Sequence, residues 1–96
     1  MRARTVFKFR LYVAGDGLNS GQAVANLRAI CDAHLAERHE IDIVDVFREP
    51  QRALAEGIFL TPTLVKLSPA PSRRIVGTLS QTQAVLQALG LDAVAT

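Results

Sequence analysis

Apolar and polar side chains follow two different periods in the first third of the chain. Between residues 6 and 13 they alternate, and the run becomes continuously apolar at Tyr12-Val13-Ala14. Alternation with period two predicts a strand that enters a buried sheet. From Ser20 to about Arg38 the apolar residues recur every three or four positions, which predicts a helix with one buried stripe. Asn19 or Ser20 is expected to cap it.

The same patterns predict five more elements, separated by turn residues. The β-branched run Ile41–Phe47 predicts a second strand, and Pro at the first turn predicts a short helix from Glu49-Pro50 to Gly57. Thr61-Pro62 sits in the loop before the next strand, and the sequence leaves its isomer open. The remaining predicted elements are strands at Thr63–Leu67 and Arg74–Gly77 and a helix from Ser80 to Gly90, opened by a Ser80/Gln83 capping box.

The predicted order is therefore β-α-β-α-β-β-α. The first βαβ unit needs parallel strands, whereas the turn at Pro69-Ala70-Pro71 makes the last two strands an antiparallel hairpin. We expect an α/β fold of the thioredoxin-like type, with a four-stranded mixed sheet and helices on both faces. A single domain is expected over residues 1–96, with a core from about 6 to 91 and loose ends.

Composition narrows the class of protein. The 96 residues are 49% hydrophobic but hold four Phe, one Tyr and no Trp, so the core is thin and self-association into a dimer or tetramer would help it. The net charge of +2 is scattered, which argues against nucleic acid as a partner. Neither a signal peptide nor a bilayer-crossing run is recognisable, so we expect a cytoplasmic protein without a membrane partner.

Three candidate chemistries have competing structural readings. Cys31, the one cysteine, is either a packed core residue or a reactive thiol; no Cys-x-x-Cys pair exists. With His34 and His39 it offers too few clustered ligands for zinc. Gly15-x-Gly17 resembles a dinucleotide fingerprint, but Ser20 stands where the third glycine belongs, so a tight turn is favoured. We predict no metal and no cofactor.

Three segments together resemble the KaiB family. They are Leu11-Tyr12-Val13-Ala14-Gly15-Asp16 with Asn19-Ser20; Ile43-Val44-Asp45-Val46 with Pro50-Gln51; and Thr61-Pro62-Thr63-Leu64-Val65-Lys66-Leu67 with Pro69, Pro71, Arg73-Arg74-Ile75-Val76-Gly77 and Leu79-Ser80. The resemblance implies a non-enzymatic clock, timing or stress-signalling adaptor. Such a protein would bind a KaiC-type ATPase ring and modulate its phosphorylation and ATPase cycle. It also implies a clock histidine kinase pathway as a competitor and an alternative, tetrameric ground-state fold of the C-terminal half.

The chain departs from that family at four positions. Gly57 replaces a common lysine, Thr78 a common Asp, and Ala88 and Gly90 stand where Gly and Asp are frequent. Glycine within a helix costs roughly 1 kcal/mol relative to alanine. Ala88 therefore favours a helical C-terminal half, and we expect the protein to rest in the thioredoxin-like form.

The binding-module hypothesis assigns partner contacts to the second strand, the short helix and the loop that follows it. Arg73 and Arg74 have two readings: an acid-recognition patch formed with Lys66, or, as the sequence favours, a solvated edge strand that discourages aggregation. Competing functions are a structural homo-oligomer, a paralogue with a different protein partner, and a Cys31-dependent thiol enzyme. The predicted contact residues are Lys8, Arg10, Ile41, Ile43, Asp45, Gly57, Thr61, Pro62, Lys66, Arg73 and Arg74.

Overall fold

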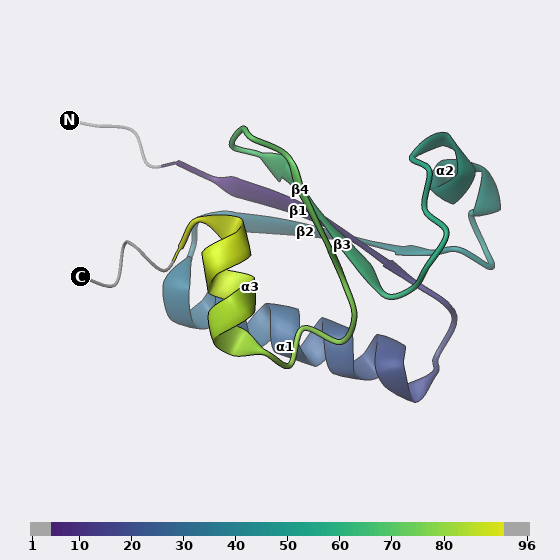
Figure 1. Cartoon of the computed structure of the whole chain (residues 1–96), viewed down its shortest axis with the longest axis horizontal. Helices are drawn as coiled ribbons and strands as arrows, with labels where there is room; N and C mark the ends of the chain where they lie inside the picture. Colours follow the sequence, from purple (N-terminus) through teal and green to yellow (C-terminus); the bar gives the residue numbers. More distant parts are fainter. Residues whose placement is uncertain (1–4, 92–96) are drawn as a thin grey trace.

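The computed structural model describes residues 5–91, and its elements follow the predicted order (Figure 1). The expected loose ends fall mostly on residues 1–4 and 92–96, which lie outside the described part. The elements are β1 (Phe7–Val13), α1 (Leu18–His34), β2 (His39–Asp45), α2 (Pro50–Ala55), β3 (Thr63–Ser68), β4 (Arg73–Val76) and α3 (Thr82–Leu89).

The sheet has the order β2-β1-β3-β4, so β2 and β4 form its edges. β1 pairs parallel with β2 and antiparallel with β3, and β3 and β4 form the predicted antiparallel hairpin. The mixed sheet is confirmed. In register, Phe9 lies beside Lys66 and Lys66 lies beside Arg73.

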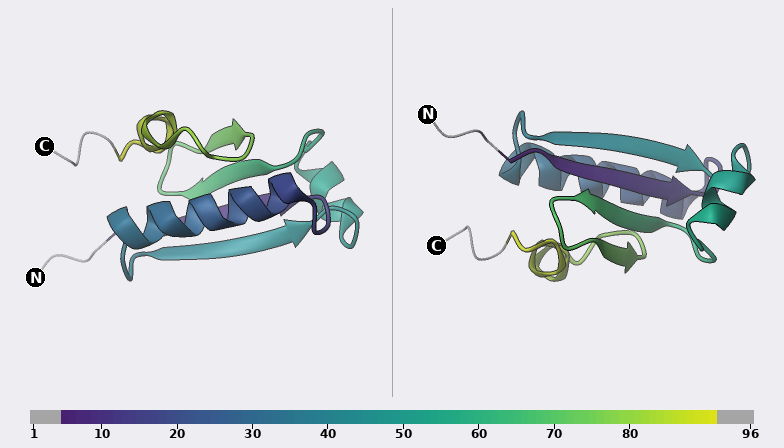
Figure 2. Two further views of the ribbon diagram at one scale, coloured as in Figure 1. Left: turned by 90° about the horizontal axis from the view of Figure 1, so that it is seen from below. Right: turned by 90° about the horizontal axis from the view of Figure 1, so that it is seen from above.

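The helices divide between the two faces of the sheet (Figure 2). On the first face α1 and α3 cover the larger apolar cluster, which includes Phe9, Leu11, Leu27, Leu64 and Leu89. On the second face α2 covers a smaller cluster: Tyr12, Val44, Ala53, Ile58 and Val65. Because side chains alternate across a strand, neighbours such as Leu11 and Tyr12 belong to different clusters.

The predicted N-terminal helix caps are wrong. α1 begins after Gly17 without a side-chain cap, and the Ser20 hydroxyl instead accepts from the N–H of Ala14, 3.2 Å away. α1 also ends at His34 rather than near Arg38. α3 begins after Gln81 without a side-chain cap, so the capping box of Ser80 and Gln83 does not form.

The C-terminal half is helical where the sequence predicted a helix. Gly90 ends α3 in the left-handed conformation at φ +76°, as expected for a C-terminal glycine. The loop before α3 is tied to α1, because the Asn26 side chain donates to the carbonyl of Thr78 at 2.8 Å. The described chain therefore has the thioredoxin-like form rather than strands over residues 81–89.

Candidate docking surface

The predicted contact residues do not share one face of the sheet. Strand alternation places Lys8, Arg10 and Arg74 on the α2 face and puts Ile41, Ile43, Asp45, Lys66 and Arg73 on the α1/α3 face. Gly57, Thr61 and Pro62 lie in the loop that joins α2 to β3. A partner that touches all of them has to reach around an edge of the sheet.

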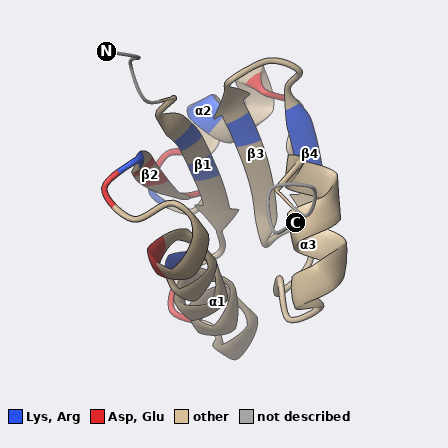
Figure 3. Ribbon diagram, turned by 90° about the vertical axis from the view of Figure 1, so that its left-hand side faces the viewer, with Lys and Arg blue, Asp and Glu red and all other residues tan. Residues whose placement is uncertain are grey.

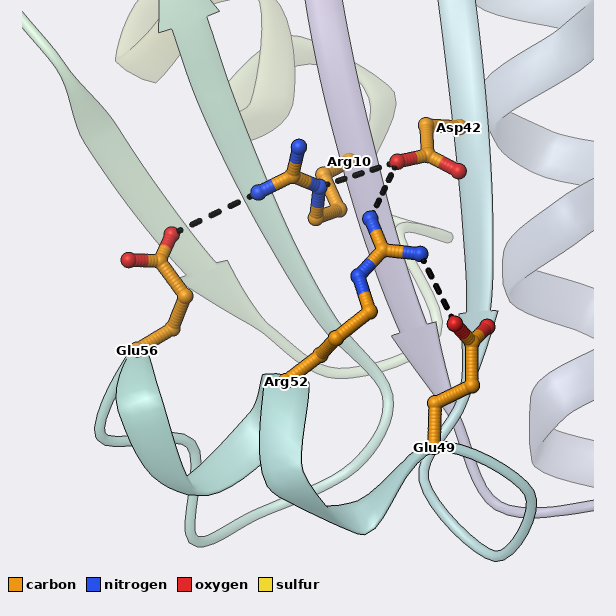
Figure 4. Close-up of polar contacts among 5 residues, drawn as sticks. All are labelled: Arg10, Asp42, Glu49, Arg52 and Glu56. Carbon is orange, nitrogen blue, oxygen red and sulfur yellow. Dashed lines mark hydrogen bonds and ion pairs between the residues drawn. The ribbon is translucent and has the colours of Figure 1, made fainter.

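A chain of charged side chains fastens α2 to the sheet (Figure 4). Asp42 Oδ2 accepts from Arg52 at 2.7 Å and from Arg10 at 3.0 Å. The outer ends of the chain are Glu49, 3.1 Å from Arg52, and Glu56, 3.7 Å from Arg10. Hydrogen bonds from Arg52, and then from Arg10, hold the pKa of Asp42 below its usual value in spite of partial burial. Two arginines beside one carboxylate fix the position of α2.

Arg74 joins β4 to the end of α2. Its guanidinium donates to the carbonyl oxygens of Glu56 and Gly57, just beyond the last residue of α2. Helix C-termini carry partial negative charge on such carbonyls, so a cation there is favourable. Arg73, the adjacent residue, lies on the opposite face of the sheet. The two arginines that the sequence groups together therefore have different surroundings.

The loop after α2 presents apolar side chains to solvent. Phe59 is 85% exposed, Leu60 63% and Val76, on β4, 57%. These three side chains, which we call the apolar rim, line a hollow of about 160 Å³ together with Gly57, Thr63 and Arg74. Below the rim Pro62 is buried, and its peptide bond with Thr61 is cis. Aromatic side chains and arginine are enriched in protein interfaces, so Phe59 and Arg74 are the members of this hollow that best fit such a surface.

Sequence reasoning missed the apolar rim and most of the charged chain. Phe59 and Leu60 fall between two elements, where neither the helical nor the strand period assigns them a partner. One signal could have identified them: Phe59 and Leu60 directly precede Thr61-Pro62, the loop that the sequence already assigned to partner contacts. Phe47 and Leu54 are also more than two thirds exposed at the loop before α2 and on α2 itself.

One β2 residue of the predicted set, Ile43, lies along a second groove. Ile43 is 36% exposed and lines this groove of about 530 Å³ with Val13, Gly15 and Val24. Asp45 has a structural task, because its Oδ1 accepts from the N–H groups of Gly15 and Phe47. It fixes the β1–α1 turn, so a partner would compete with these bonds for its carboxylate.

The thiol and metal hypotheses find little support in the described residues. Cys31 is fully buried in the larger cluster, and burial followed by the nearby Asp32 raises its pKa to about 11. A thiol with that pKa is almost entirely protonated at neutral pH and is a poor nucleophile. Within residues 5–91 no group of three or more His, Cys, Asp or Glu is placed to hold a metal ion. Nor does any helix of this part have the length and hydropathy to cross a membrane.

Two solved structures share this architecture. The N-terminal domain of Synechococcus elongatus SasA superposes with a TM-score of 0.75 at 21% identity, covering 100% of this chain and 90% of that one. Chloroplastic thioredoxin z gives a TM-score of 0.75 at 18% identity, covering 94% and 81%. At these identities the likeness establishes the thioredoxin-like fold alone.

Sequence comparison identifies the family. A family model described as the KaiB domain matches residues 10–91. The circadian clock protein KaiB3 of Synechocystis sp. is 47% identical over 85 residues, which are 88% of this chain and 81% of that protein. The circadian clock oscillator protein KaiB of Prochlorococcus marinus is 41% identical over 92 residues, covering 96% and 86%. The chain therefore belongs to the KaiB family of circadian clock proteins.

Proposed function

We propose that the protein is a non-enzymatic clock or stress-signalling adaptor that docks on a KaiC-type ATPase ring and modulates its phosphorylation and ATPase cycle. The observation that carries the proposal is the apolar rim, held in place by Arg74 and α2 on a chain of the KaiB family. Exposed aromatic side chains of this kind supply most of the binding energy in many protein interfaces. The proposal includes a cytoplasmic location.

The proposal extends to competition and self-association. A clock histidine kinase pathway would compete for the same ring, and the shared fold of the SasA N-terminal domain supports a common docking shape. A dimer or tetramer in at least one state is part of the same proposal, because the core is small and large apolar side chains are exposed.

The direct test mixes the purified protein with the KaiC-type ATPase of its source organism, in ATP and in ADP, and follows the complex by size exclusion with light scattering. Phe59→Ser and Leu60→Ser should each weaken binding by about tenfold or more, because hot-spot side chains exceed roughly 1.4 kcal/mol. Leu18→Ser is the matched control, since Leu18 is 77% exposed at the start of α1, outside the rim.

The absence of a complex in both nucleotides at tens of micromolar would overturn the ATPase assignment. The molar mass of the protein alone tests self-association in the same run.

Alkylation tests the thiol enzyme: Cys31 should label slowly in the native state and rapidly in urea. Rapid, stoichiometric labelling of the native protein would revive that alternative.

A further inference from the structure

Charged side chains segregate by strand across the sheet (Figure 3). β2 carries Glu40, Asp42 and Asp45 and has no Lys or Arg, whereas β4 carries Arg73 and Arg74 and has no acid. The one charged residue of β3 is Lys66. β1 carries Lys8 and Arg10, so positive charge extends from β1 across β3 to β4, whereas the acids of the sheet lie on β2.

Lys66 occupies an unusual position for a lysine. It lies on the α1/α3 face beside Arg73, is 5% exposed, and places its Nζ 5.8 Å from the centre of the Phe7 ring. Burial, and then the charge of Arg73, lower its pKa. Within residues 5–91 neither Lys66 nor Arg73 has a carboxylate within ion-pair distance or a side-chain hydrogen bond.

Lys66 and Arg73 are adjacent cations, so their charges repel each other and an anion between them would relieve that repulsion. Lys66 buries its methylene stem, which lowers the pKa of its ammonium group, and the cation–π contact with Phe7 favours the charged form. The Lys66 side chain is also held in place by its burial, so it would lose little freedom on binding an anion.

We propose that Lys66 and Arg73 form a receptor for one Asp or Glu side chain of the protein partner. A carboxylate has two acceptor oxygens, so one can face the ammonium group of Lys66 and the other the guanidinium of Arg73. The ring of Phe7 would form an apolar wall beside it. The inference rests on the proposed function, which supplies the partner.

The location of the receptor constrains how the partner approaches. The receptor lies on the α1/α3 face, whereas Arg74 and the apolar rim lie on or beside the α2 face. β4 is the edge strand between them. A partner that uses both sites has to wrap around β4 and insert its carboxylate from the far side of that edge.

The receptor can be tested without the ATPase by titrating the isotope-labelled protein with N-acetylglutamate amide, a blocked glutamate whose side chain is its one charge. The NMR signals of the Lys66 side chain and of the Phe7 ring should shift and saturate. The blocked glutamine analogue should leave them unmoved. Lys66→Met, which keeps an apolar stem, and Arg73→Gln, at an exposed position, should each abolish the shift of the Phe7 ring, which can be followed in both variants.

Equal shifts with the glutamine analogue, or an unchanged response in both variants, would overturn the receptor.

With the ATPase, Arg73→Gln should lower affinity by about tenfold, the loss expected for a charge-assisted hydrogen bond. Arg28→Gln, which removes an exposed cation from α1, should bind as the parent does. Unchanged affinity in Arg73→Gln would contradict the partner role of the receptor. If the parent protein binds no ATPase, the proposed function fails, and the blocked-glutamate titration still decides the receptor.

Discussion

The helices on the two faces of the sheet are attached to it by different forces. The α1/α3 face buries a cluster of more than a dozen residues, almost all aliphatic, with Leu11, Leu27 and Leu35 fully covered. The α2 face has a five-residue cluster and depends on the charged chain through Asp42 to fix its helix. Apolar burial is insensitive to salt and pH, whereas partly exposed ion pairs respond to both. The first face holds most of the core, and the second carries Arg74 beside the apolar rim.

The sharpest test of this contrast removes a side chain from the large cluster. Leu27→Ala should lower the free energy of unfolding by about 3–5 kcal/mol, because it leaves a cavity in a fully buried position. Urea unfolding measures the loss, which should be equal at low and high salt. A loss below about 1 kcal/mol would mean that α1 repacks freely over the sheet.

The next test addresses the loop after α2. Gly57 has φ +68°, and a Cβ built there would lie 4.0 Å from the Arg74 guanidinium. Gly57→Lys should destabilise the protein by about 1–2 kcal/mol, the cost of the left-handed conformation for an L-residue. Gly57→Asn is the control and should cost less, because Asn tolerates that conformation.

The third test moves to the charged chain. Because the folded protein holds the pKa of Asp42 below its unfolded value of about 3.9, its contribution to stability is present above that pH. It is lost as pH falls through the folded-state pKa. Asp42→Asn should therefore flatten the pH dependence of unfolding on the acid side, with a cost of about 1 kcal/mol or less at neutral pH. If the pH dependence of the free energy of unfolding on the acid side is as steep in the variant as in the parent, other carboxylates cause that dependence.

The smallest effect is expected inside the α2-face cluster. The Tyr12 hydroxyl is buried and, within the described chain, makes no hydrogen bond of acceptable geometry. The adjacent Arg10 is near enough for this hydroxyl to raise the pKa of the guanidinium. Tyr12→Phe removes a desolvated polar group, so stability should be unchanged or rise by less than about 1 kcal/mol. A clear destabilisation would indicate that the hydroxyl is bonded in solution.

The sequence predicted the elements well because each depends on local periodicity. The alternation ending at Val13, the stripe of α1 and the terminal Gly90 correspond to observed elements. The caps failed because a cap depends on how the chain enters its helix. Ser20 turns back toward Ala14 rather than to the start of α1.

The candidate site was harder to predict, because it depends on which face a helix covers. Alternation alone shows that Arg73 and Arg74 point to opposite faces, but it does not show that α2 lies over Arg74. The partners of Asp42 come from β1 and α2, respectively 32 and 10 residues away in sequence. Such contacts become visible once the sheet order is known.

The hydrogen bond from Gly77 N to Pro62 O, 2.9 Å long, shows which backbone groups of β4 are free to pair with a further strand. Backbone direction alternates along a strand, so Arg73 and Ile75 also bond inward to β3, and Arg74 and Val76 turn their backbone groups outward. The outer edge of β4 therefore offers the backbone groups of two residues, a shorter ladder than the seven-residue β2 provides at the opposite edge. A filament built by sheet extension needs an adhesive strand at each end of every subunit. Because the β4 edge is the shorter of the two, pairing of two sheets through β2 is favoured over a continuing stack.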